Sequence, residues 1–234
     1  MKMLKTIFAA ALSFAAVSVS AQTADEVIGK YVTAMGGAAK LNSINSVVME
    51  GSISVQGMDI PVTVTSVNKK GSRTDIEAMG QSGYQIINPT KSWKFYPFQG
   101  DTEPVQSSEA EHNLSKDQLD MTDKLLHAKD LNIKVEYLGK ESIDGAPAHK
   151  LKLTKPSGEE SFSYIDEKTS YIVRKSMTKE INGTKMEIIT TYKDFKQTPE
   201  GFWYPYTIDS NIQGTVTFSK IAINTPVDEK IFSL

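Results

Sequence analysis

Residues 47–64 read VVMEGSISVQGMDIPVTV, and apolar side chains recur in this stretch at every second position. The apolar members of the two runs are Val47, Met49, Ile53, Val55, Met58, Ile60, Val62 and Val64. A period of two places these side chains on one face of a strand. The dipeptide Gln56-Gly57 separates the runs, and a two-residue connection of this kind is typical of a hairpin. The stretch therefore predicts two antiparallel strands with one buried and one solvated face.

The same alternation continues to the C-terminus at regular spacing. The turn signals between the later strands are Lys69–Ser72, Gly80–Gly83, Asp144-Gly145, Pro156–Gly158, Asn182-Gly183 and Pro199–Gly201. Short connections of this kind predict an antiparallel meander. About eleven strands in one twisted sheet must curl. The sheet can close into a barrel or leave a half-closed apolar trough.

Two segments have helical character. Thr23 and Glu26 form a capping box, an apolar stripe follows at helical spacing, and Gly36-Gly37 supplies the end. We expect this helix to dock on the sheet. Ser115 with Gln118 predicts a second capped helix, within an insertion between Pro97 and Ile133. Such an insertion can act as a lid or simply cover one end of the sheet, and both alternatives stay open.

The N-terminus has the order of a secretory signal. Lys2 and Lys5 precede an apolar run over 7–19, and Val19-Ser20-Ala21 supplies small residues at a cleavage site. We predict a signal peptide at 1–21 with cleavage after Ala21, followed by one domain at 22–234. The apolar run is too short for a membrane span of ~20 residues.

Charge and cysteine content limit the class of protein. The whole chain has 26 basic and 28 acidic residues and no cysteine. Loss of the two signal lysines brings the net charge near −4, which argues against nucleic acid as a partner. Without cysteine there are no disulfides and no lipid anchor at the cleavage site. We predict a periplasmic protein that is not lipid-anchored.

The sequence contains no recognisable catalytic or metal-binding motif. His112, His127 and His149 have no metal-ligand spacing, and no thiolate site is possible. No nucleophile elbow, phosphate loop or nucleotide fingerprint occurs. We therefore predict no enzyme activity, no catalytic residue, no metal and no cofactor.

The inward faces of the strands and the inserted segment suggest a site of another kind. The residues that we expect to line a cavity are Met49, Ile53, Val55, Met58, Ile60, Val62, Val64, Ile76, Trp93, Phe95, Leu119, Leu125 and Leu126. An apolar trough without a charged anchor suits an acyl chain or a similar lipid. The alternative is that helices and sheet pack solidly and leave no cavity.

Four ordered motifs resemble those of one family. They are ADEVIGKYVTAMGGAAKL at 24–41, the Asp-x-x-Thr turn in Tyr164–Thr169, Gly201-Phe202-Trp203-Tyr204-Pro205, and the tail NTPVDEKIF at 224–232. Together they span nearly the whole mature chain. The sequence resembles the LolA-like proteins, which are periplasmic carriers and sorting proteins for outer-membrane lipoproteins.

The resemblance implies a mainly β fold with a helical lid (α+β): an incomplete, strongly curved antiparallel β-barrel over an apolar cavity. It implies a soluble chaperone for protein transport in outer-membrane biogenesis, a monomer that binds lipoprotein acyl chains. The implied partners are an inner-membrane exporter and an outer-membrane receptor. An early arginine locks the lid in known members, and Arg73 is the candidate here. The alternative function is a lipid- or lipoprotein-sensing module that uses the same cavity.

Overall fold

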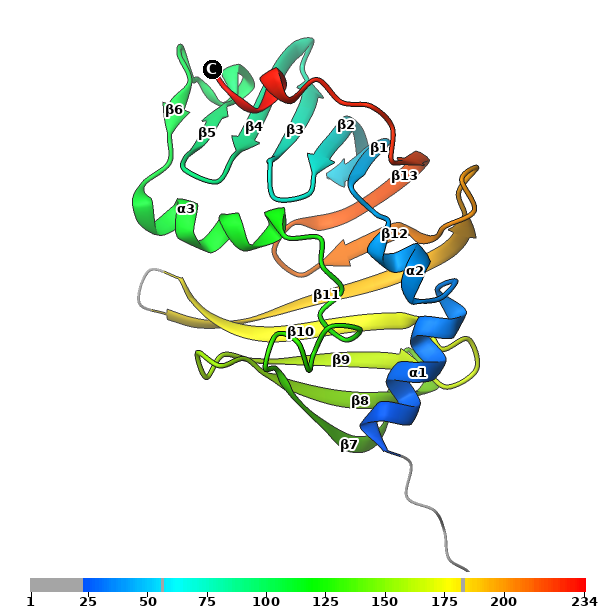
Figure 1. Ribbon diagram of the computed structural model, residues 1–234. Helices are drawn as coiled ribbons and strands as arrows, with labels where there is room; N and C mark the ends of the chain where they lie inside the picture. Colours follow the sequence, from blue (N-terminus) through cyan, green and yellow to red (C-terminus); the bar gives the residue numbers. More distant parts are fainter. Residues whose placement is uncertain (1–22, 56, 182–183) are drawn as a thin grey trace, which may run out of the picture.

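The structure is a computed structural model that describes residues 23–55, 57–181 and 184–234. The predicted signal peptide, the cleavage after Ala21, residue Gln56 of the first turn and the turn Asn182-Gly183 lie outside the described residues. The described chain forms one antiparallel sheet of thirteen strands in the order β6-β5-β4-β3-β2-β1-β13-β12-β11-β10-β9-β8-β7 (Figure 1). The strands are β1 Ser46–Val55, β2 Met58–Val67, β3 Gly71–Ala78, β4 Gln81–Ile87, β5 Ser92–Phe95, β6 Val105–Gln106, β7 Lys134–Ile143, β8 Ala146–Thr154, β9 Glu160–Asp166, β10 Ile172–Ile181, β11 Thr184–Gln197, β12 Trp203–Ser210 and β13 Gly214–Ile223.

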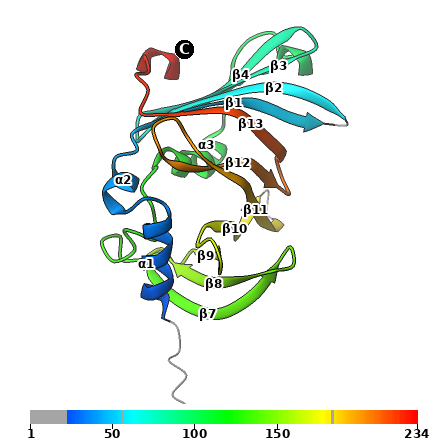
Figure 2. The same cartoon turned by 90° about the vertical axis from the view of Figure 1, so that its right-hand side faces the viewer.

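The sheet consists of two meanders joined at one seam. Strands β1–β6 form the first meander, strands β7–β13 form the second, and β1 pairs with β13 at the seam. The predicted curved, incomplete barrel with a helical cover is confirmed, with thirteen strands instead of about eleven. Figure 2 shows the meanders as the upper and lower arms of an open shell. We call the concave surface of this shell the inner face and the convex surface the outer face.

The seam requires a glycine at its bulge. Pairing of β1 with β13 shifts register between Glu50 and Gly51. A Cβ built on Gly51 would lie 2.2 Å from the Thr217 carbonyl oxygen, which is backbone and cannot rotate away. A glycine is therefore the residue that lets the two meanders approach at this point.

The predicted first helix is confirmed as α1, Ala24–Ala34. The Thr23 hydroxyl accepts from the Glu26 N–H at 3.2 Å, and the Thr23 N–H donates to the Glu26 carboxylate at 3.1 Å. Gly36 and Gly37 follow with φ of 99° and 94°, which glycine adopts at little cost. A short helix α2, Ala38–Asn42, leads into β1.

The chain crosses from one free edge of the sheet to the other between β6 and β7. We call residues 107–133 the crossover segment. It contains α3, Glu109–Ser115, and the 3-10 helix η2, Lys116–Leu119, followed by turns. Because β6 and β7 are the opposite edges of a curled sheet, this connection must pass in front of the concave side, as Figures 1 and 2 show.

The predicted helix after Ser115 is only the short 3-10 helix η2, and its predicted capping box with Gln118 does not form. The second capping box joins Ser108 and Glu111, and Ser115 ends that helix by donating its hydroxyl to the carbonyls of Glu111 and His112. Beyond η2, the Asp123 side chain accepts from the N–H groups of Leu125 and Leu126 at 3.0 and 2.8 Å. An aspartate that binds nearby backbone in this way stabilises a turn in place of a helix.

The two meanders are covered on opposite faces. Helix α1 packs on the inner face of the second meander, where Val27 and Tyr31 contact a cluster that includes Leu151 and Ile165. The C-terminal segment with the 3-10 helix η3, Glu229–Phe232, packs on the outer face of the first meander. Its Phe232 ring lies so close to Gly71 that a Cβ there would be 2.2 Å from the ring. A further 3-10 helix, η1 Pro97–Gln99, follows β5.

Candidate functional site

An apolar surface extends across the inner faces of β1, β2 and part of β3 and across the seam. In β1 and β2, the paired residues are Met49 with Val64, Gly51 with Val62 and Ile53 with Ile60. Directly paired residues of antiparallel strands project from the same face. The surface continues through Ile76 on β3 and through Val216 on β13. We call this concave surface, together with the inner faces of β10–β12, the trough.

The trough is open to solvent near its rim. Met58 is 57% exposed and Met186, on β11, is 42% exposed, whereas Val62 deeper in the sheet is only 4% exposed. Ile53, Ile60, Val64 and Ile76 have intermediate exposure. The structure thus brings together the predicted lining residues of β1–β3. Val55 pairs with Met58 at the end of the hairpin, and its side chain lies outside the described part.

Trp93 and Phe95 do not line the trough. Their register partners are Ile86 and Tyr84, and Trp93 packs with Ile86, Val67 and Phe232 on the outer face. The inner face of β5 instead presents Ser92 and Lys94. The expectation was wrong because the C-terminal segment supplies an apolar cover on the outer face, where aromatic side chains of β4 and β5 can be buried.

Arg73 also lies on the outer face, away from the crossover segment. Its guanidinium pairs with Asp75 at 2.8 Å, stacks 4.6 Å from the centre of the Tyr84 ring and donates to the Ile231 carbonyl at 3.4 Å. These contacts tie the C-terminal segment to the sheet. The structure therefore places Arg73 where it cannot contact the crossover segment as a lid lock.

The three predicted leucines of the crossover segment lie at the mouth of the trough. Leu119 and Leu125 are buried, and Leu126 is half-buried. Leu125 packs under α1 with Val27 and Leu151, against the second meander. These leucines thus stand beside the trough rather than on its floor.

Three contacts hold the crossover segment across the mouth. The Lys69 N–H donates to the Leu119 carbonyl at 2.8 Å, next to the first meander. The Tyr31 hydroxyl donates to the Asp123 carboxylate, next to the second. Buried His112 of α3 is hydrogen-bonded through Nδ1 to the Ser92 hydroxyl at 2.7 Å. The segment is therefore fixed to both arms of the shell.

Three ionisable groups, Asp120, Tyr31 and Tyr192, have clearly shifted pKa values. Burial opposes the charged form of Asp120, but hydrogen bonds from Lys124 and Thr122 outweigh it and lower the pKa of Asp120 to about 2. Burial, together with the Asp123 carboxylate, raises the pKa of Tyr31 above its usual range. Burial raises the pKa of Tyr192, on β11, to about 12. At neutral pH these groups are a carboxylate and two neutral phenols.

A separate cleft lies beside the crossover segment. Its volume is about 490 Å³, within the usual size of ligand pockets. The residues that line it are Lys69, Pro89, Lys116, Asp117, Leu119, Asp120, Lys124, Leu131, Ile133, Lys155 and Pro156. Of the predicted lining residues, only Leu119 belongs to it. Its lysine-rich lining sets it apart from the apolar trough.

Two lysines of the trough were missed from the sequence: Lys175 and, nearer the rim, Lys179, which pairs with Met186. Lys175 of β10 pairs with Ser163 and Thr190, on the same face as Leu151, and therefore projects inward. The sequence predicted a trough without a charged anchor. Strict alternation of apolar and polar residues is broken in the run Ile172-Val173-Arg174-Lys175. This break was the one sequence signal of the β-bulge that turns Lys175 inward.

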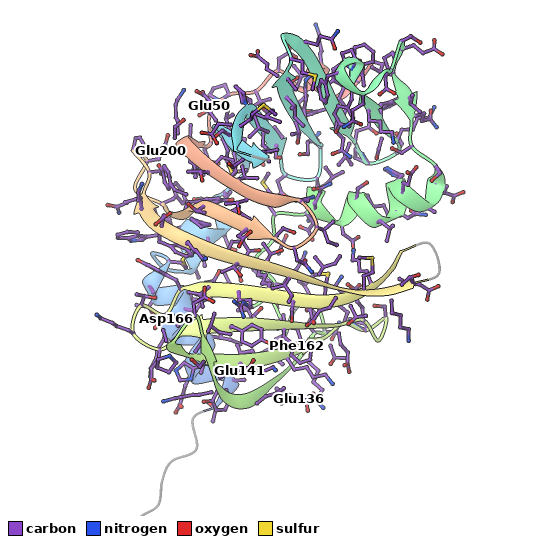
Figure 3. The ribbon with its side chains drawn as sticks, turned by 180° about the vertical axis from the view of Figure 1, so that it is seen from behind. Glu50, Glu136, Glu141, Phe162, Asp166 and Glu200 are labelled. Carbon is purple, nitrogen blue, oxygen red and sulfur yellow. The ribbon has the colours of Figure 1, made fainter. Side chains whose placement is uncertain are left out.

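The outer face of β7–β9 is charged. Figure 3 shows Glu136, Glu141 and Phe162 on this side of the molecule. Glu141 pairs with Lys150 at 2.9 Å, and the Lys150 ammonium lies 5.0 Å from the centre of the Phe162 ring.

Two further features bear on the class of site. Among residues 23–55, 57–181 and 184–234, no group of three or more His, Asp or Glu side chains could hold a metal ion. Within the same ranges, no helix has the length and apolar character needed to cross a membrane.

Buried His149 is hydrogen-bonded to the Tyr137 hydroxyl at 3.2 Å and shares the inner face with Leu151.

A curled antiparallel sheet with an apolar concave face and a crossing segment defines an open half-barrel. Comparison with solved structures places this half-barrel among the LolA-like folds. A LolA superfamily protein from Nitrosomonas europaea is 14% identical with a TM-score of 0.53, over 92% of this chain and 99% of that chain. A domain described as an outer membrane lipoprotein-sorting protein domain, from Vibrio parahaemolyticus, is 13% identical with a TM-score of 0.50, over 88% and 94%.

A DUF1329 family protein from Desulfovibrio piger has the same architecture. It is 12% identical with a TM-score of 0.56, over 90% of this chain and 97% of that chain. No family model and no curated protein sequence matches the chain. The resemblance noted from the sequence motifs is thus confirmed as a shared fold, and at these identities the comparison shows the fold alone.

Proposed function

We propose that this protein is a periplasmic carrier that binds lipoprotein acyl chains, or a related lipid, in the trough. The observation that supports the proposal most is the continuous apolar inner face of β1, β2 and β3, which is exposed at Met58 and only partly buried at Ile53, Ile60, Val64 and Ile76. Soluble proteins seldom leave a large apolar surface open unless it binds something. The proposal assigns no catalytic step to the protein.

The crossover segment fits the needs of a carrier. Burying an acyl chain is worth about 0.8 kcal/mol per methylene, or roughly 12 kcal/mol for ~15 methylenes before ordering costs. A rigid site of that affinity would release its load slowly. We propose that residues 107–133 partly close the empty trough and that cargo displaces them, which lowers the net affinity.

The test is native mass spectrometry of protein exported in a Gram-negative host, followed by titration with a fluorescent acyl probe. We expect co-purified lipid and reversible probe binding for the wild type. Ile60→Asp places a carboxylate on the floor of the trough and should abolish binding. The control Thr65→Asp lies on the outer face next to Arg73 and should bind normally.

Circular dichroism must show both variants folded. Folded Ile60→Asp protein with wild-type binding would contradict the proposed site. Turnover of the probe would contradict the carrier proposal and indicate an enzyme, and binding that only changes affinity for a protein partner would favour the sensing alternative.

A further inference from the structure

Lys175 stands in the trough because of a β-bulge. Ile172 pairs with Ile165, but Arg174 pairs with Tyr164, so that Val173 is an extra residue on β10. Beyond an extra residue, every later side chain changes face. Arg174 therefore projects outward, where it bonds Asp144 at 3.1 Å, and Lys175 projects inward.

Lys175 has no counter-ion among the described residues. The charged groups that act on its ammonium are Asp123 and Lys124 of the crossover segment. Asp123 already accepts from the Tyr31 hydroxyl and two backbone N–H groups, and Lys124 pairs with Asp120. The aromatic ring of Tyr192 lies 5.9 Å from the ammonium. The cation thus faces the trough without a carboxylate of its own.

The surroundings of Lys175 suit an anion. Its two register partners, Ser163 and Thr190, lie on the neighbouring strands on either side of β10 and carry hydroxyls on the same face. Its side chain is exposed to solvent in the open trough, and the protein packed around it removes part of the hydration of the ammonium and lowers the pKa of Lys175. A bound anion would restore the lost stabilisation, because an ion pair is stronger where water is scarce.

We propose that the trough selects an anionic amphiphile, with a carboxylate or phosphate held by Lys175 and an acyl chain along the apolar floor. This inference rests on the proposed lipid-binding function and specifies its ligand class. A neutral acyl ester or amide that fills the trough would leave the ammonium desolvated and unpaired, which is unfavourable. Charge, in addition to chain length, therefore determines which lipid binds.

The test compares oleate with oleyl alcohol, which share a chain and differ in charge. Isothermal titration should show at least tenfold tighter binding of oleate by the wild type. Lys175→Met should remove this preference while oleyl alcohol still binds. Lys193→Met makes the same change at an outer-face lysine that pairs with Asp144, and it should keep the preference. Lysophosphatidic acid against monoolein then shows whether a phosphate is accepted as well as a carboxylate.

The outcomes separate the two proposals. If neither oleate nor oleyl alcohol binds the wild type, the lipid-binding function itself is wrong. If both bind the wild type equally, or if Lys175→Met keeps the preference for oleate, the trough binds lipid but Lys175 is not its anion anchor.

Discussion

The two meanders are built alike and buried differently. Both are antiparallel hairpins with alternating side chains, yet the first is covered on its outer face by the C-terminal segment and the second on its inner face by α1. The inner face of the second meander is consequently closed at β8 and β9 under α1, with Leu151 fully buried, whereas the first meander remains open at Met58. The difference shows that the free surface of a sheet is decided by where the covering segments dock, and not by alternation within the strands.

The largest expected effect concerns the outer cover of the first meander. Phe232 is buried against Gly71, Val67 and Ile86, so Phe232→Ala should lower the free energy of unfolding by about 3–5 kcal/mol. Leu234→Ala, at an exposed position two residues further on, should change it by less than about 0.5 kcal/mol. Urea denaturation measures both. Equal stability of the two variants would mean that the C-terminal segment does not hold the sheet.

The next prediction compares the loss of folding stability caused by truncating one side chain on each inner face. Leu151→Ala in the covered second meander should cost about 2–5 kcal/mol, because it leaves a cavity under α1. Ile60→Ala in the open first meander should cost clearly less, since its side chain is only partly buried without ligand. Thermal and urea unfolding test this order. A larger loss for Ile60→Ala would show that the trough is closed in solution.

The smallest effect concerns the attachment of the crossover segment. Asp120, next to Lys69 and Lys124, has its pKa lowered from 3.8 to about 2, so its charge stabilises the fold above pH 4 and this contribution is lost as pH falls toward 2. Because Asp120 is partly exposed, Asp120→Asn should cost at most about 1 kcal/mol at pH 7. The difference from the wild type should shrink on acidification. A difference that is independent of pH would exclude the charge as its cause.

The sequence predicted the regular parts of this comparison. Alternation in 47–64 placed Met49, Ile53, Ile60 and Val64 on one face, and the Thr23–Glu26 box located α1. These features are local, because propensity and period act within a few residues. These local features were sufficient to predict the fold class and the residues of β1 and β2 that line the trough.

The remaining features depend on contacts between distant segments. Trp93 and Phe95 alternate correctly, but only the docking of Phe232 decides which face is buried. Lys175 is placed inward by a single extra residue on β10, and a bulge depends on strand pairing more than on composition. The course of residues 120–133 depends on side-chain bonds such as Tyr31 to Asp123, which join positions far apart in the chain.

The central claim is that lipid occupies the open inner face of the first meander and the seam. The most direct measurement is photo-crosslinking with a diazirine-bearing fatty acid, followed by mass-spectrometric mapping of the labelled residues. We predict labels on inner-face positions such as Ile53, Ile60 and Val216. Excess oleate should suppress this labelling. Labels confined to the outer face around Trp93, or to the lysine-rich cleft around Lys155, would contradict the central claim.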